Sequence, residues 1–219
     1  MADKSNIEWT DATWNPIVGC SVVSPGCTNC YAMKMAARIQ KMNRTGGSGS
    51  NYVNHYDGTT QDSKAGAVWT GKVALAPDKL FLKPMSWKQP RRVFVNSMGD
   101  LFHESISDEW IDRVFAIMAL CERHTFQILT KRADRMKSYI NRWFMRLAES
   151  DQIFPHPTGP TKINAMFDWA VMPSVLPNVW LGVSCERQQE ADERIPLLLQ
   201  TPAAVRFISA EPLLGAIDL

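Results

Sequence analysis

Residues 91–100 read RRVFVNSMGD, a short apolar strand pattern that ends in polar residues and a glycine. Residues 106–122, ISDEWIDRVFAIMALCE, follow with apolar side chains at helical spacing behind Ser107, a suitable N-cap. A second strand pattern, HTFQILTKR at 124–132, comes next. A strand, a helix and a strand in this order predict a βα unit of a parallel sheet.

The same alternation extends in both directions along the chain. Towards the C-terminus we expect a helix at 132–150, a strand at 178–186, a helix at 187–200 kinked at Pro196, and a strand at 204–214. Towards the N-terminus we expect a short strand in WNPIVGC at 14–20 and a helix in YAMKMAARIQKM at 31–42. The sequence therefore predicts five strands of an α/β fold.

Length and composition indicate one globular domain over residues 1–219, because 45% of the residues are hydrophobic, 21% are charged and the formal net charge is +2. Irregular insertions are expected near 44–66 and 151–177, where Gly, Ser, Asn, Asp or Pro are frequent. The start lacks the pattern of a secretory signal, and no apolar run approaches the length of a membrane span. We therefore expect a cytoplasmic protein that makes no membrane contact.

Three of the five cysteines lie within VGCSVVSPGCTNCYA at 18–32, namely Cys20, Cys27 and Cys30. In a reducing compartment such a group more often binds metal or does redox chemistry than forms structural disulfides. Structural zinc would need a fourth ligand, for which the candidates are Cys185, His55 and His103. A [4Fe–4S] cluster on three cysteines instead leaves one iron open, which would explain why the group stops at three. Cys121 lies in a predicted amphipathic helix and fits an ordinary buried thiol.

Polar residues follow the predicted strands at the ends where parallel sheets bind ligands. In 178–186, alternation gives a face that should pack beneath the helices, formed by Leu181, Val183 and Cys185. Ser184 and Glu186 fall on the opposite face, and 204–214 repeats this pattern with Ser209 and Glu211. The remaining polar strand ends supply Asn96, Ser97, Asp100, Thr130 and Lys131. The alternative is that the serines simply end strands and the glutamates cap helices.

NPIVGC followed by GCTNCYA resembles the opening of radical S-adenosylmethionine enzymes of the spore-photoproduct-lyase-like branch. Five further stretches resemble, in the same order, a phage and prophage family named for phage gene products thirty-seven and sixty-eight: IEWTDATWNP, VFVNSMGDLFHE, ILTKR, NVWLGVS and RFISAEPLLG. This second resemblance covers nearly the whole chain. The cysteine spacing, C-x6-C-x2-C, departs from the usual C-x3-C-x2-C of radical S-adenosylmethionine enzymes.

The resemblance implies a partial (βα) TIM-like barrel of the radical S-adenosylmethionine type, apparently truncated at AIDL, where the family continues with a further strand and helix. It also implies an enzyme of phage origin in which Cys20, Cys27 and Cys30 hold a [4Fe–4S] cluster and S-adenosylmethionine binds the open iron. Cleavage of S-adenosylmethionine at this cluster would give a 5′-deoxyadenosyl radical that acts on an unidentified substrate. Phage origin suggests nucleic acid or a nucleotide as the substrate class. The reaction would also require a reductant for the cluster.

By position, the cofactor-binding residues that this reading implies are Asn96, Ser97, Asp100, Thr130, Lys131, Ser184, Glu186, Ser209 and Glu211. The alternative function is a zinc-stabilised, non-catalytic nucleic-acid-binding module, in which Trp9, Trp14 and Tyr31 could stack on bases.

A barrel that stops after its fifth strand leaves that strand with unpaired backbone groups. We therefore expect the strand at 204–214 to be covered by a partner chain, by an oligomer contact or by the N-terminal segment.

Overall fold

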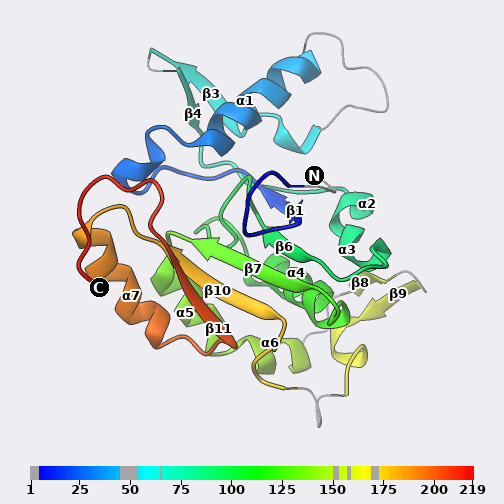
Figure 1. The fold of residues 1–219 in the computed structure, drawn as a ribbon. Helices are drawn as coiled ribbons and strands as arrows, with labels where there is room; N and C mark the ends of the chain where they lie inside the picture. The colour runs from blue at the N-terminus through cyan, green and yellow to red at the C-terminus, as the bar shows by residue number, and fades with distance from the viewer. Residues whose placement is uncertain (1–4, 45–53, 65, 150–152, 157–158, 169–172) are drawn as a thin grey trace.

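A five-stranded parallel sheet forms the centre of the computed structural model, which describes residues 5–44, 54–64, 66–149, 153–156, 159–168 and 173–219 (Figure 1). Its strands, in spatial order, are β1 (Ala12–Trp14), β6 (Arg92–Val95), β7 (Thr125–Thr130), β10 (Val179–Ser184) and β11 (Val205–Ser209). Every neighbouring pair is parallel. The predicted α/β class is therefore confirmed, and the carboxyl ends of all five strands meet at one edge of the sheet.

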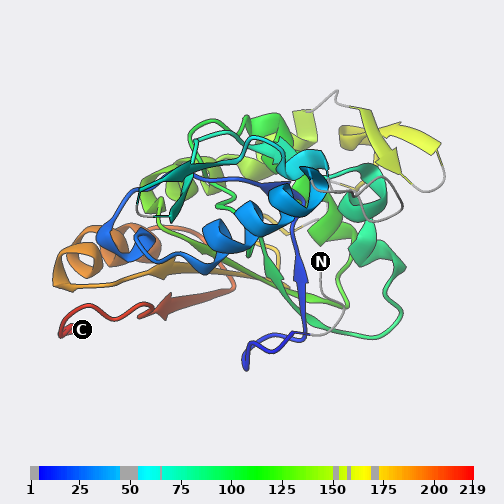
Figure 2. The same ribbon diagram turned by 90° about the horizontal axis from the view of Figure 1, so that it is seen from above.

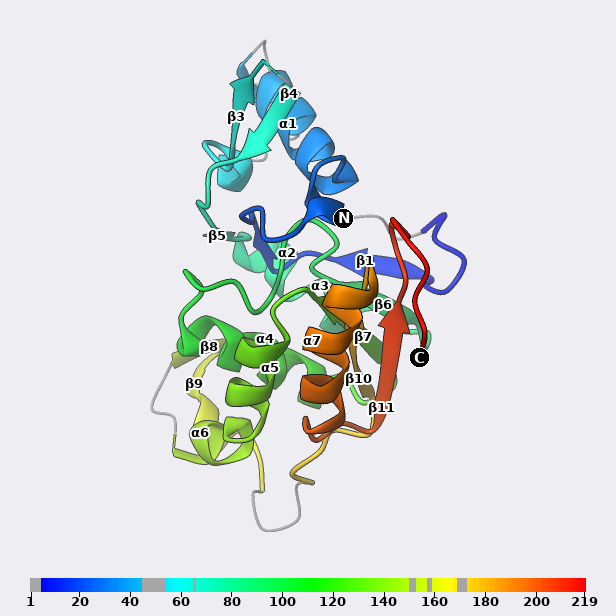
Figure 3. The ribbon, with the colours of Figure 1, turned by 90° about the vertical axis from the view of Figure 1, so that its left-hand side faces the viewer.

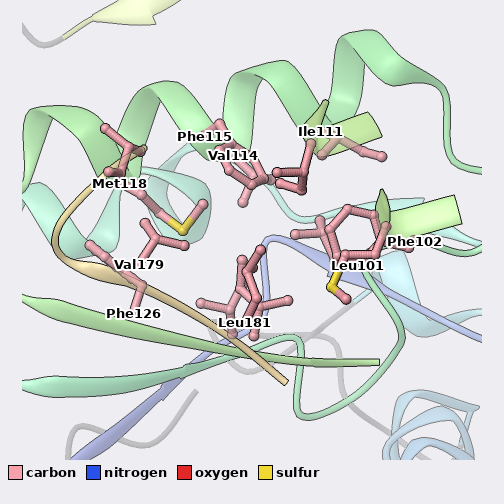
Figure 4. Close-up of a cluster of buried hydrophobic side chains, with 14 of the residues drawn as sticks. Leu101, Phe102, Ile111, Val114, Phe115, Met118, Phe126, Val179 and Leu181 are labelled. Carbon is pink, nitrogen blue, oxygen red and sulfur yellow. The ribbon is translucent and has the colours of Figure 1, made fainter. Parts of the chain in front are cut away.

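Helices cover one face of this sheet (Figures 2 and 3). They are α4 (Asp108–Leu120), α5 (Ala133–Ile140), α6 (Trp143–Glu149) and α7 (Gln188–Leu199). The main core lies between the helices and the sheet, where apolar side chains of α4 meet Phe126 and Leu181 of the strands (Figure 4). Burying apolar side chains on this face is the main force that holds helices and strands together.

The predicted alternation of β10 is confirmed on the helix side. Leu181, Val183 and Cys185 are all buried in the main core. On the other side, Gly182 leaves room for the ring of Phe207, because a Cβ at this glycine would lie 2.5 Å from ring atoms. The ring of Trp9 packs near Phe207 at 6.4 Å between centroids, so the N-terminal segment covers part of that face.

The first strand of the sheet ends earlier than the sequence pattern predicts. Pro16 lacks an N–H and cannot donate to a ladder, so β1 ends at Trp14. The following residues form β2 (Ile17–Val18), which pairs antiparallel with β5 (Ala74–Leu75). A parallel bridge between Gly19 and Gly99 then brings the chain back beside the end of β6. The predicted helix after the cysteines is present as α1 (Tyr31–Arg44).

The predicted helix at 132–150 is divided into α5 and α6. The side chain of Trp143 turns into the main core at the break, and its Nε1 donates to the carbonyl oxygen of Ser174 at 2.8 Å. This contact comes from a distant segment, which explains why local periodicity did not reveal the break. In α7, by contrast, Pro196 lies inside the helix as expected.

Both irregular regions contain short hairpins in their described parts. The first holds η2 (Asn54–Tyr56), β3 (Thr60–Ser63) and β4 (Gly66–Trp69), and the second holds β8 (Ile153–His156), β9 (Gly159–Lys162) and η3 (Ile163–Ala165). The remaining short helices are η1 (Pro25–Cys27), α2 (Asp78–Phe81) and α3 (Lys83–Ser86). Trp69 and Tyr56 pack against Met33 of α1 in a second, smaller apolar cluster. The described part of the first region, 54–64, therefore contains a short helix and a strand where its composition predicts a loop.

Candidate functional site at the carboxyl edge of the sheet

The loop that carries the three cysteines is attached to the carboxyl ends of two strands. At its start, the Gly19 N–H donates to the carbonyl oxygen of Met98, beyond β6, at 3.2 Å. In its middle, Ser24 Oγ donates to Glu186 Oε1, just after β10, at 2.6 Å. At its end, Tyr31 Oη donates to the carbonyl oxygen of Ser97 at 2.8 Å. The loop thus lies at the edge where parallel sheets bind ligands.

Glu186 is completely buried and joins three elements. Its carboxylate accepts hydrogen bonds from Ser24 of the loop, from Lys131 Nζ after β7 and from Arg194 Nη1 of α7, the last at 2.8 Å. Burial raises the pKa of Glu186, but the hydrogen bonds from Lys131 and Ser24 outweigh burial and hold it below its usual value. Gly26 packs directly against this carboxylate, since a Cβ there would lie 2.4 Å from Oε1.

Arg132 forms a second polar cluster around Cys20. Its guanidinium donates to Asp100 Oδ2 at 3.0 Å, to Glu104 Oε2 at 2.8 Å and to Ser21 Oγ at 2.7 Å. The Cys20 Sγ lies 3.6 Å from Arg132 Nη1. Two carboxylates and one thiol therefore share a single buried cation, which fixes the beginning of the cysteine loop against the end of β7.

The electrostatics of this cluster keep Cys20 protonated when no metal is bound. Burial and the charge of Asp100 raise the pKa of Cys20 to about 12, although Arg132 acts in the opposite direction. Burial lowers the pKa of His103, which contacts Ser21 in the same cluster. The Ser105 N–H donates to His103 Nδ1, so the ring proton lies on Nε2, 3.0 Å from Ser21 Oγ.

Several predicted cofactor-binding residues form hydrogen bonds that connect the strand ends. Asp100 Oδ1 accepts from Thr130 Oγ1 at 2.7 Å, and Asp100 Oδ2 accepts from the Lys131 N–H at 3.1 Å. Ser97 Oγ donates to Asn15 Oδ1 at 3.1 Å. The structure thus brings these residues to one edge, as the pattern of strand ends predicts, and the side chains of Asp100 and Thr130 bond directly to each other.

Asn96 has an unusual environment. Its backbone φ is 58°, in the left-handed region, and only 3% of its surface is exposed. Neither Nδ2 nor Oδ1 of its amide has a hydrogen-bond partner among the described residues. Buried polar groups are normally paired, so an unpaired amide in a strained backbone position is a candidate for ligand recognition.

The two Ser-x-Glu patterns differ in their surroundings. Ser184 and Ser209 are register partners across β10 and β11, the first buried and the second half-buried. Glu186 is buried in the cluster described above, whereas Glu211 is exposed after β11. Similar sequence patterns therefore give one internal and one exterior carboxylate.

The three thiols share a loop but do not surround a common point. All five cysteines are free, and within the described ranges no three Cys, His, Asp or Glu side chains are close enough to hold a metal ion. Cys27 Sγ lies 3.8 Å from Ser24 Oγ, away from the Arg132 contact of Cys20. The three thiols are the kind of donor that a zinc ion or an iron–sulfur cluster uses, but the loop would have to rearrange before all three could bind one group.

Each of the three candidate fourth ligands for zinc has contacts of its own. Cys185 is buried in the main core on the helix side of the sheet, with its Sγ 3.9 Å from the carbonyl oxygen of Glu190. His103 has both ring nitrogens in hydrogen-bonding contacts. His55 lies in η2 beside the ring of Tyr56, at 4.7 Å between centroids.

The sequence pattern did not single out five residues that organise this site, namely Ser21, Ser24, Glu104, Arg132 and Arg194. Arg132 and Ser24 carried a usable signal, since one follows a predicted strand end and the other precedes a Pro-Gly turn within the cysteine loop. Arg194 carried none, because its contact with Glu186 depends on how α7 packs.

Comparison with known proteins gives no match among curated proteins and none among solved structures. None of the helices in the described part of the chain is long and apolar enough to cross a membrane. The profile of a family described as "Protein of unknown function (DUF5131)" matches residues 4–219, which is nearly the entire sequence. The chain therefore belongs to this family.

Proposed function

We propose that this protein is a radical S-adenosylmethionine enzyme in which Cys20, Cys27 and Cys30 hold a [4Fe–4S] cluster. The observation that carries the proposal is the position of the cysteine loop, which is bonded to the ends of β6 and β10 at the carboxyl edge of a parallel sheet. We further propose that this sheet, with helices on one face, is part of a (βα) barrel. In such barrels the chemistry lies at the carboxyl edge of the strands.

When bound and reduced by an external electron donor, the cluster would supply one electron to cleave S-adenosylmethionine into methionine and a 5′-deoxyadenosyl radical, which would abstract hydrogen from a substrate. The residues of the chain would bind and orient. The unpaired amide of Asn96 offers a donor and an acceptor for polar groups of the cofactor. Ser184 and Ser209 lie at the same edge, while Glu186 holds the cysteine loop through Ser24.

Anaerobic reconstitution tests the proposal directly. Purified protein is treated with iron, sulfide and a thiol, and then with S-adenosylmethionine and dithionite. We expect a brown protein with close to four irons and four sulfides per chain, which releases 5′-deoxyadenosine. A colourless protein that retains one zinc and forms no 5′-deoxyadenosine would instead support the zinc-stabilised binding module.

Single substitutions test the ligand set. Changing Cys20, Cys27 or Cys30 to Ala should remove most of the iron, because each thiolate binds a different iron and none can replace another. Cys121→Ala is the control, since this thiol is buried in the main core and should leave the iron content unchanged. Full iron and sulfide in all three single variants would contradict the assignment.

A further inference from the structure

The exposed face of α1 is basic. It is formed by Tyr31, Lys34, Met35, Arg38, Lys41 and Met42, which recur at spacings of three and four residues. The fourteen residues of α1 include four Lys or Arg and no Asp or Glu. Since the whole chain has a formal net charge of only +2, the rest of the protein is net acidic. Positive charge is therefore concentrated on this helix.

Tyr31 gives this face an aromatic surface next to the cysteine loop. It is the first residue of α1 and directly follows Cys30. Its hydroxyl donates to the carbonyl oxygen of Ser97 at 2.8 Å, yet 57% of the residue is exposed. A ring that is tethered at its tip and open to solvent is preorganised for stacking, because little conformational entropy is lost when a planar group lies on it.

The direction of α1 connects this face with the candidate site. Figure 3 shows α1 running outwards from the edge where β10 and β11 end. Lys34 lies one turn from Tyr31 and Arg38 lies two turns away, so cationic groups extend from the tethered ring along the helix. A flexible polyanion that follows these cations would arrive at the carboxyl edge of the sheet.

We propose that the exposed face of α1 binds single-stranded nucleic acid, with Tyr31 stacking on a base and with Lys34 and Arg38 contacting phosphates. Cationic grooves interleaved with aromatic rings are the usual means of binding single strands without sequence preference. Binding of nucleic acid by α1 does not depend on the proposed function. The further step, that this nucleic acid is the substrate of the cysteine site, rests on the proposed function.

The composition of the face favours nucleic acid over a membrane. Helices that lie in a bilayer surface bury Leu, Phe or Trp on their apolar side. The exposed apolar residues of α1 besides Tyr31 are Met35 and Met42, which lie between the cations. An acidic protein partner would use the same cations, but it would gain no stacking from Tyr31, and this difference is measurable.

Fluorescence anisotropy of the full chain without metal, using labelled 12-nucleotide DNA and RNA over a range of salt concentrations, tests the proposal. We expect Lys34→Gln combined with Arg38→Gln to weaken binding at least about tenfold at low salt and to reduce the slope of log K against log salt by about 1.4, which is about 0.7 for each lost phosphate contact. Tyr31→Ala should weaken binding about tenfold, and Tyr31→Phe, which keeps the ring but loses the tether to Ser97, should weaken it less. Lys79→Gln combined with Lys88→Gln, an equal loss of charge elsewhere, is the matched control.

Three results would overturn the assignment. The wild type could fail to bind at low salt, or the control pair could weaken binding as much as the α1 pair. Alternatively, polyglutamate or anionic vesicles could displace the oligonucleotide while Tyr31→Ala has no effect, which would assign the face to an acidic protein or a membrane. Because no cluster is needed for this measurement, its failure is distinct from a failure to form 5′-deoxyadenosine.

Discussion

At the scale of single residues, Glu186 and Glu211 show how packing gives different properties to two similar sequence patterns. Each glutamate follows a strand serine by two residues, but Glu186 is buried among three hydrogen-bond donors and Glu211 is exposed. The donors of Glu186 come from the cysteine loop, β7 and α7. Sequence periodicity predicts that both carboxylates follow strands, but it cannot show which one will meet those elements.

Glu186→Gln should destabilise the protein by about 3 kcal/mol at pH 7, because Lys131 and Arg194 would lose the carboxylate that compensates their charges. Denaturant unfolding of the metal-free protein measures this free energy. The matched control is Glu211→Gln, where the exposed position should change the free energy of unfolding by less than about 0.5 kcal/mol. Equal effects of the two substitutions would contradict the description of Glu186 as a buried anchor.

The effect of Glu186 should also depend on pH. An unfolded Glu has a pKa of about 4.3, and the folded pKa is lower. The contribution of the carboxylate to stability is therefore fully present above about pH 5 and is lost as the pH falls through the folded pKa. The stability gap between wild type and Glu186→Gln should narrow from pH 7 to pH 3.5. If the difference in free energy of unfolding between the two proteins increased as the pH falls, the pKa of Glu186 would not be lowered by folding.

At the scale of elements, the turn η1 fits against Glu186 only because residue 26 is glycine. A Cβ at Gly26 would lie 2.4 Å from the carboxylate, so Gly26→Ala should push the turn away and break the bond from Ser24. We expect a loss of about 1–3 kcal/mol in the free energy of unfolding. Gly215→Ala is the control, because no atom lies within 4 Å of a Cβ there.

A double-mutant cycle tests whether Gly26→Ala acts by breaking the hydrogen bond between Ser24 and Glu186 or by straining the structure elsewhere. If Gly26→Ala already breaks the hydrogen bond between Ser24 and Glu186, then adding Ser24→Ala should cost much less than it costs in the wild type. Fully additive effects in chemical denaturation would show that the turn stays in place and that the strain lies elsewhere.

The elements also show which parts of the fold a local pattern can predict. The helix side of β10 follows from alternation, because Leu181 and Val183 must be buried together. The break between α5 and α6 does not, because it depends on Trp143 reaching the carbonyl oxygen of Ser174. The early end of the first strand could have been predicted, because Pro16 has no N–H to donate to a strand ladder.

For the whole molecule, parallel strands in chain order bring distant polar residues to one edge. Asp100 and Thr130, thirty positions apart, form a direct hydrogen bond there. This part of the site follows from the alternation of strands and helices, which is visible in the sequence. Whether the thiols of Cys20 and Cys27 meet depends on the path of an irregular loop with no periodic pattern, so sequence reasoning predicts their proximity in the chain and not their mutual geometry.

The free edge of the sheet leads to the last prediction. Among the described strands β11 pairs only with β10, and 38% of Ile208 is exposed. The N-terminal segment reaches the face of β11 through Trp9 and Phe207 but forms no described ladder with its edge. Because an exposed strand edge favours pairing with another chain, we expect two copies to associate through β11.

Sedimentation should show a dimer that dissociates on dilution, with backbone amides of 205–209 protected from exchange only in the dimer. Ile208→Lys should abolish both, while Leu199→Lys, at an exposed apolar position at the end of α7, should leave them unchanged. A monomer at every concentration, with rapidly exchanging amides in β11, would contradict the expectation.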